Sequence, residues 1–337
     1  MGFPDVSVLL PYKNASATLA AALSGLLETG DPGVEVLAID DGSCDSGPRQ
    51  VASWATRDSR VRPLTAPGSG LISALNAALG HARGAFIARM DADDIAHPQR
   101  LSRQRAHLRN SPTLDVVGCR VEAFCPGGEV GEGLTRYVAW QNSLLTPEDH
   151  ARELFIESPL CHPSVMLRRE RLSALGGYRD LPGPEDYDLW LRCDAAGLSM
   201  AKLPETLLSW RHTSGRATFC DARYSPASFR KTKAPFLAKR LRKAGTTRYV
   251  MWGAGPTGRR LARELEAHGA RPACFVDIDP RKLGRTARGV PIVAPDGLDG
   301  RRDLLVIAVG ARGARELIRP ELSRLGFTEN ENAWFAA

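Results

Sequence analysis

Short apolar segments alternate with amphipathic ones through the first 110 residues, and this alternation limits the folds open to the chain. Buried-strand patterns cover 5–11, 34–39, 61–65 and 85–90. Helix patterns follow the first and third of them, and Pro98 fits the first turn of another helix after the fourth. Strands that alternate with helices form a mostly parallel sheet with helices packed on its faces. Ligands bind such sheets where the strands end. The sequence therefore predicts an α/β fold with a site at these strand ends.

A second strand–helix alternation begins after Gly245, and a basic segment precedes it. The segment 223–243 contains no acidic residue and eight basic ones: Arg223, Arg230, Lys231, Lys233, Lys239, Arg240, Arg242 and Lys243. We expect three parts, namely an α/β domain over 1–222, a basic linker helix over 223–245, and a small Rossmann-like α/β domain over 246–337.

Composition places the chain among cytoplasmic globular proteins. It has 337 residues, of which 43% are hydrophobic, and no apolar run approaches the roughly 20 residues that span a bilayer. No secretory signal is evident, and seven cysteines without a CxxC pair suit a reducing compartment.

The net charge of +7 resides in the basic segment, so no nucleic-acid partner is expected. The segment could instead contact anionic lipid at the inner face of the membrane, or it could be a solvated helix face.

An acidic cluster follows directly on the predicted strand 85–90. Asp91 and Asp93 are two residues apart, so in an extended segment their side chains share a face. Two such carboxylates suit Mg²⁺ or Mn²⁺ and leave positions open for substrate phosphates. The alternative is a solvated acidic turn.

A second acidic pair, Asp40 and Asp41, ends the predicted strand 34–39. Carboxylates there can accept hydrogen bonds from a nucleobase N–H or a ribose hydroxyl. Gly42 and Ser43 behind them also fit a plain turn with a helix cap.

Further motifs in a fixed order give residues 6–215 a family resemblance. They are Val8-Leu9-Leu10-Pro11-Tyr12-Lys13-Asn14, Asp40-Asp41-Gly42-Ser43, Leu75-Asn76, Ala82-Arg83-Gly84, Met90-Asp91-Ala92-Asp93-Asp94, Pro98-Gln99-Arg100-Leu101, His162-Pro163-Ser164, Gly176-Gly177-Tyr178 and Pro184-Glu185-Asp186-Tyr187-Asp188-Leu189-Trp190. This stretch resembles glycosyltransferase family 2, whose members adopt the nucleotide-sugar-binding GT-A fold.

The resemblance implies a donor site at the strand ends. The nucleoside of a nucleoside-diphosphate sugar would contact Pro11, Tyr12, Asp40 and Asp41. Asp91 would reach the ribose or the metal, and Asp93 would be the principal ligand of Mg²⁺ or Mn²⁺. His212 is a further candidate ligand, although a structural hydrogen bond is the other interpretation.

The resemblance also implies an acceptor side. Asp186, paired with Glu185, would be the general base of an inverting transfer to the hydroxyl of a glycan or lipid-linked acceptor, in polysaccharide or glycolipid assembly. Without the family, both residues could simply be first-turn acids that stabilise a helix. His162 could position the acceptor or a phosphate, or serve a structural hydrogen bond.

The C-terminal part carries a glycine motif of its own. Gly253, Gly255 and Gly258 form GxGxxG after the predicted strand 248–252, and Asp277 ends the next strand. Such a turn can place a phosphate at a helix N-terminus, with the acid on a ribose. We expect a nucleotide or NAD(P) here, or a module that only mediates assembly. Two alternatives for the whole chain stay open: an NAD(P)-dependent oxidoreductase centred on this motif, and a non-catalytic sugar-nucleotide-binding module.

Overall fold

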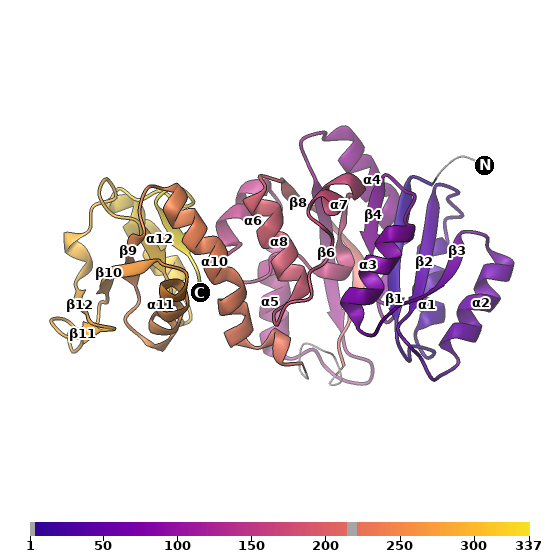
Figure 1. Ribbon diagram of the computed structural model, residues 1–337, viewed down its shortest axis with the longest axis horizontal. Coiled ribbons are helices and arrows are strands. Elements are labelled where there is room, and N and C mark those ends of the chain that lie inside the picture. Colours follow the sequence, from indigo (N-terminus) through magenta and orange to yellow (C-terminus); the bar gives the residue numbers. More distant parts are fainter. Residues whose placement is uncertain (1–3, 214–220) are drawn as a thin grey trace. The chain divides into compact units, whose positions relative to one another are not determined.

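Two separate β-sheets organise the chain in the computed structural model, which describes residues 4–213 and 221–337 (Figure 1). Contacts group these residues into two units with one sheet each. The first unit contains most of the chain up to residue 213. The second contains 221–337 together with Ala151–Ser158 and Pro182–Leu191. Two short stretches of the predicted first domain therefore group with the C-terminal part.

In the described residues, the first unit has an eight-stranded sheet in the order β3-β2-β1-β4-β7-β6-β8-β5. Its strands are β1 (Val6–Tyr12), β2 (Val34–Asp40), β3 (Val61–Thr65), β4 (Phe86–Arg89), β5 (Ile95–Ala96), β6 (Val116–Phe124), β7 (Met166–Arg168) and β8 (Met200–Arg211). Neighbouring strands among β3, β2, β1 and β4 are parallel, and β6 and β8 are also parallel to each other. β7 is antiparallel to its neighbours β4 and β6, and β5 is antiparallel to β8. The predicted mixed, mostly parallel sheet is confirmed.

Helices connect most of these strands. They are α1 (Leu19–Leu27), α2 (Gly47–Arg57), α3 (Leu71–His81), α4 (Arg100–Asn110), α5 (Glu132–Ser143), α6 (Pro147–Glu153), η1 (His162–Ser164), α7 (Arg169–Ala174) and α8 (Glu185–Ala195). The apolar spacing did not predict α2, because only Gly47 and Val51 of this helix are buried.

The core of the first unit forms around β1. Every residue of this strand is buried. Val6, Val8 and Leu10 belong to one apolar cluster with Val36 and Ala38 of β2. Each fully buried Val or Leu side chain contributes roughly 1.5–3 kcal/mol relative to an exposed one. This core holds the strand ends, where the predicted site residues lie, in fixed register.

In its described part, the second unit has a six-stranded sheet in the order β11-β12-β10-β9-β13-β14. Its elements are η2 (Ala222–Tyr224), α10 (Pro226–Lys243), β9 (Arg248–Trp252), α11 (Pro256–Ala267), β10 (Arg271–Val276), β11 (Thr286–Ala287), β12 (Val290–Val293), η3 (Pro295–Gly297), β13 (Leu305–Ile307), α12 (Ala314–Arg324) and β14 (Ala333–Phe335). All neighbouring strands except β11 and β12 are parallel. The strands and helices from β9 to β14 form a small α/β arrangement, while the predicted domain bounds of 246–337 stay a prediction.

Helix α10 lies where the basic linker helix was expected, but its charge is not all on the surface. Lys233 is only 3% exposed. Its ammonium donates hydrogen bonds at 2.5, 2.9 and 3.2 Å to three carbonyls of the second unit: Phe155, Ile156 and Ala336. Burial lowers the pKa of Lys233 to about 8. The interpretation of the segment as one exposed basic face is therefore wrong for this residue. None of the helices described here is both long and apolar enough to cross a bilayer.

A buried carboxylate ties together the amino-terminal ends of the strands. Glu35 of β2 is 2% exposed and accepts a hydrogen bond from Ser7 Oγ of β1 at 2.6 Å. Its other oxygen accepts from the guanidinium groups of Arg62 in β3 and Arg83 before β4, both at 2.7 Å. Burial favours the neutral acid, but these hydrogen bonds outweigh it and hold the pKa of Glu35 below its ordinary value.

We predict that Glu35→Gln lowers the free energy of unfolding by about 3 kcal/mol, because it leaves two arginines without their buried partner. A carboxyl whose pKa is lowered by folding stabilises the protein above its unfolded pKa, near 4.5, and loses that contribution as the pH falls. As the pH falls below 4.5, the free energy of unfolding of Glu35→Gln should therefore fall less steeply than that of the wild type. Urea unfolding between pH 3.5 and 7 tests this, with the exposed Glu28→Gln as control. If the free energy of unfolding depended on pH in the same way in Glu35→Gln and Glu28→Gln, the prediction would be wrong.

Candidate functional site

The carboxyl ends of β1, β2 and β4 lie side by side in the first unit. β1 is the middle strand: its Tyr12 pairs with Asp40 of β2, and its Leu9 pairs with Arg89 of β4. The N–H of Asp41 donates to the Tyr12 carbonyl at 2.9 Å. Because these strands are parallel, both predicted acidic segments arrive at one edge of the sheet.

Asp40 and Asp41 each organise a loop at this edge. Asp40 Oδ1 accepts a hydrogen bond from the Ser43 N–H at 3.0 Å. Asp41 Oδ1 accepts one from the Gly70 N–H at 2.6 Å, and its other oxygen is 3.7 Å from Lys13 Nζ. Gly70 has a φ of 100°, which favours glycine, and directly precedes α3. A carboxylate has about four acceptor positions, so these contacts leave acceptor capacity for a ligand.

Pro11 and Tyr12 end β1 and are both buried. Burial, with added repulsion from the charges of Asp40 and Asp45, raises the pKa of the Tyr12 hydroxyl far above its ordinary value. The phenol is therefore neutral at physiological pH and can donate a hydrogen bond. A buried aromatic ring beside a carboxylate pair is a suitable environment for a planar base.

Asp91, Asp93 and Asp94 form a carboxylate cluster just beyond β4. One oxygen of each lies within 4.8 Å of the others. Asp94 is fully buried, and its Oδ1 accepts a hydrogen bond from the Arg211 N–H at 2.8 Å. The Thr18 hydroxyl fixes the intervening backbone through the Ala92 carbonyl at 2.9 Å. An all-oxygen ligand set of this kind fits a hard divalent cation such as Mg²⁺ or Mn²⁺.

Arginines surround this cluster. Arg89 is 3% exposed and forms an ion pair with Asp91. Arg100 is fully buried and donates to the Arg89 carbonyl at 2.7 Å. The guanidinium of Arg211 donates to the Asp93 carbonyl at 2.6 Å. Their positive charge offsets the repulsion among carboxylates that lie so close together.

His212 follows β8 and Arg211, and so lies next in sequence to a residue that contacts the cluster. It is 5% exposed, and its ring packs edge-on against Trp210 with centroids 4.2 Å apart. Among the described residues, the group that could hold a metal consists of the three carboxylates, and His212 is outside it. Its role as a metal ligand stays a prediction.

His162 has a structural partner. It is 6% exposed, and its Nε2 is 3.0 Å from the Tyr178 hydroxyl. The two rings also pack against each other, with centroids 5.3 Å apart. These contacts favour the structural interpretation of His162.

Glu185 and Asp186 begin α8, within the second unit, and they differ in exposure. Glu185 is 4% exposed and accepts a hydrogen bond from the Tyr224 hydroxyl at 2.7 Å. Asp186 is half-buried; its carboxylate accepts from Ser158 Oγ at 3.3 Å and from the Tyr187 N–H at 2.7 Å. The positive end of the helix dipole favours the ionised form of both acids. Glu185 is thus an internal anchor, and Asp186 is the accessible member of the pair.

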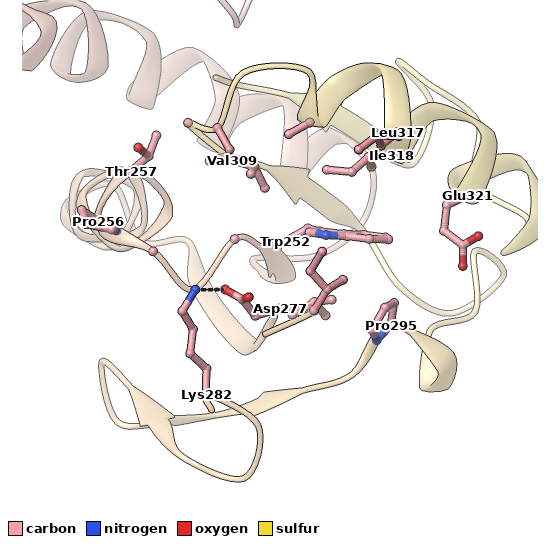
Figure 2. A pocket seen from close by; sticks show the side chains of 18 of the residues that line it. Trp252, Pro256, Thr257, Asp277, Lys282, Pro295, Val309, Leu317, Ile318 and Glu321 are labelled. Carbon is pink, nitrogen blue, oxygen red and sulfur yellow. Dashed lines mark hydrogen bonds and ion pairs between the residues drawn. The ribbon is translucent and has the colours of Figure 1, made fainter. Parts of the chain in front are cut away.

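The C-terminal candidates line a cavity of their own in the second unit (Figure 2). Gly253 and Gly255 lie in the turn between β9 and α11, Gly258 lies in the first turn of α11, and Asp277 follows β10. The first two glycines and Asp277 contribute directly to the cavity wall.

Sequence reasoning missed several residues that shape these sites. Arg89 stands at the end of an otherwise apolar strand, directly before the acidic cluster, and that pattern could have predicted a buried ion pair. Tyr224 gave no such signal, because it is 39 residues from Glu185 in the chain.

The chain is similar to known glycosyltransferases in sequence. A family model described as glycosyl transferase family 2 matches residues 7–176. EpsE of Bacillus subtilis (strain 168) is 32% identical over 216 residues, which cover 63% of this chain and 74% of that protein. The amylovoran biosynthesis glycosyltransferase AmsE of Erwinia amylovora is 30% identical over 208 residues, covering 61% and 75%. The O-antigen biosynthesis glycosyltransferase WbnJ of Escherichia coli is 26% identical over 241 residues, covering 70% and 90%.

Solved structures show a similar fold. TarS 1-349 from S. aureus, in complex with UDP-GlcNAc, is 18% identical with a TM-score of 0.57, covering 78% of this chain and 72% of that one. The mannosyltransferase PcManGT from Pyrobaculum calidifontis, in complex with GDP-Man and Mn²⁺, is 20% identical with a TM-score of 0.50, covering 80% and 74%. These similarities confirm the GT-A fold that the sequence predicted.

Proposed function

This chain belongs to glycosyl transferase family 2, and from that premise we propose that it transfers a sugar from a nucleoside-diphosphate sugar to an acceptor hydroxyl with inversion at the anomeric carbon. The observation that carries the proposal is the cluster of Asp91, Asp93 and Asp94 at the same sheet edge as Asp40 and Asp41. Family membership favours this activity over an oxidoreductase centred on the C-terminal motif and over a module without catalysis.

The donor would bind across this edge. Pro11, Tyr12, Asp40 and Asp41 would contact the nucleoside, while Asp93, assisted by Asp91, would hold Mg²⁺ or Mn²⁺. The bound cation would neutralise the charge that grows on the departing diphosphate. Two structural neighbours support a donor of this class, since one holds UDP-GlcNAc and the other GDP-Man with Mn²⁺.

Asp186 would act as the general base. Its carboxylate would take the proton of the acceptor hydroxyl while that oxygen bonds to the anomeric carbon. The bond from this carbon to the diphosphate oxygen breaks, and its electron pair leaves with the diphosphate. The partial exposure of Asp186 and the burial of Glu185 support this division, with Glu185 positioning the start of α8 through Tyr224.

The acceptor would be a glycan or a lipid-linked glycan. AmsE is named for amylovoran biosynthesis and WbnJ for O-antigen biosynthesis, which supports a role in polysaccharide or glycolipid assembly. The reaction would take place in the cytoplasm or at the inner face of the membrane, with nucleotide sugars as donors.

We predict that release of nucleoside diphosphate from a panel of UDP- and GDP-sugars requires Mn²⁺ or Mg²⁺. Asp93→Asn removes a charged ligand and should lower the rate at least about 100-fold, comparable to the loss of one transition-state contact. The exposed Asp296→Asn, in the second unit, is the matched control and should keep the wild-type rate. Turnover that persists in EDTA, or in Asp93→Asn, would contradict the donor site.

The base is tested separately. Asp186→Asn should lower kcat by about 10²–10⁴-fold and leave the donor KM and the melting temperature nearly unchanged, because only proton transfer is lost. Glu185→Gln should instead lower the melting temperature, since the buried Tyr224 contact is weakened. Steady-state kinetics and thermal unfolding distinguish the two. An Asp186→Asn variant with wild-type kcat would rule this residue out as the base.

We also propose peripheral contact with anionic membrane through the exposed lysines of α10, Lys231, Lys239 and Lys243. Each lysine near such a surface contributes about 1 kcal/mol. The full chain should sediment with phosphatidylglycerol vesicles at low salt, and replacing the three lysines with glutamine should abolish this. The buried Lys233 is left intact. Equal sedimentation with neutral phosphatidylcholine vesicles would contradict the contact.

A further inference from the structure

A cavity of about 710 Å³ opens at the strand ends of the second unit (Figure 2). Trp252 ends β9, Asp277 follows β10 and Ala308 follows β13, and all three line it. β9 is the central strand, with β10 on one side and β13 on the other. Ligands of parallel α/β sheets bind at such a reversal of strand order, and this volume is typical of small-molecule sites.

The glycines of the motif do not all serve the fold. A Cβ at Gly258 would lie 1.9 Å from the Gly253 carbonyl, and Gly253 itself has a φ of 123°. Packing and backbone conformation therefore require both. Gly255 has a φ of −78°, which any residue adopts, and a Cβ there would meet nothing within 4 Å. It lines the cavity and is the N-cap of α11. A glycine that the fold does not need keeps the backbone open to close approach by a ligand.

The charges beside Gly255 suit an anion. Helix α11 begins at Pro256, which has no N–H, and its N-cap has no side-chain hydrogen bond. The N–H groups that the first turn offers to an anion are therefore those of Thr257 and Gly258. Arg312 lines the cavity, and no carboxylate of the described residues pairs with it. Lys282 Nζ also lines it, 2.8 Å from Asp277 Oδ2. Burial favours the neutral acid at Asp277, but its hydrogen bonds, above all the one from Lys282, together outweigh burial and keep the pKa of Asp277 below its ordinary value.

Apart from Thr257 and Glu321, the rest of the cavity is lined by apolar side chains and backbone, and it includes a flat aromatic wall. The carboxylate of Glu321 forms an ion pair with Arg324. Trp252 is 4% exposed and lines the cavity. Figure 2 shows this indole between Asp277 and the side chains of Leu317 and Ile318. Leu317 is 79% exposed and Ile278 is 76% exposed, although both line the cavity. Large apolar side chains left in water around a concave site mark a binding surface.

We propose that this cavity binds a nucleoside phosphate, with the phosphate at Gly255 and the first turn of α11, and the base against Trp252. Lys282 and Arg312 supply the charge that a phosphate needs, and Asp277 is placed to accept a ribose hydroxyl. This cavity lies within the second unit, whereas the proposed donor site lies within the first. We assign a mononucleotide, because among the described residues the cavity offers one such glycine turn and one acid for a ribose, Asp277; a dinucleotide is an outcome of the test.

The test uses the full chain in EDTA, so that binding at the carboxylate cluster is suppressed. Isothermal titration with UMP, AMP and GMP should show one site for at least one of them. Gly255→Asp places a carboxylate where the phosphate would lie, and it should weaken binding at least tenfold. Because Asp is a preferred N-cap residue, the melting temperature should stay the same or rise. The matched control is Gly297→Asp, an exposed glycine of the same unit with equally open space, and it should bind like the wild type.

Three results would overturn the proposal: none of the nucleotides binds, binding survives Gly255→Asp, or binding is lost in Asp93→Asn. Tighter binding of NAD⁺ than of AMP would also overturn it, because the ligand would then be a dinucleotide. Metal-dependent sugar transfer should persist in Gly255→Asp, so failure of this site and failure of the transferase activity are distinguishable.

Discussion

The carboxylate cluster beyond β4 depends on buried positive charge. Three acids with oxygens within 4.8 Å repel one another, and the nearby ion pair between Arg89 and Asp91 offsets part of that repulsion. Arg100 binds the Arg89 carbonyl, and its Nε lies 3.2 Å from Gln104 Oε1. The amide of Gln104 in turn donates to carbonyls of β6 and η1. The arginines that offset the charge of the cluster thus also connect β4 to β6 and η1 through Gln104. A bound cation would complete the balance of charge.

The strands that carry the candidate donor site could be predicted from the sequence, because each strand is defined by residues that are close together in the chain. β1 and β2 are mostly apolar and buried, each with one polar residue near its start, Ser7 and Glu35, and β2 ends on Asp40. Parallel neighbours end at one edge, so the strand pattern alone places Asp40 and Asp91 at the same edge. The same logic located the C-terminal glycine turn and Asp277.

What the sequence could not predict depends on contacts between distant residues. In the sequence, Lys233 resembles the exposed lysines around it. It is nevertheless buried, and its ammonium donates hydrogen bonds to carbonyls 77, 78 and 103 residues away in the chain. Glu185 and Asp186 could be recognised as a pair, but only the Tyr224 hydroxyl distinguishes the anchored acid from the accessible one. The weakly apolar α2 was missed because two buried residues do not make a helical pattern. The glycine motif likewise gave three equivalent glycines, and only their surroundings single out Gly255.

The proposed transfer depends on a divalent cation that the carboxylates beyond β4 would hold for a nucleoside diphosphate. A Mn²⁺ titration of the full chain followed by electron paramagnetic resonance measures this directly. We expect one bound Mn²⁺ in the first unit, with higher affinity in the presence of UDP or GDP, and loss of this binding in Asp93→Asn. The proposed cation site would be contradicted if Asp93→Asn bound Mn²⁺ with unchanged affinity, or if UDP and GDP left the Mn²⁺ affinity of the wild type unchanged.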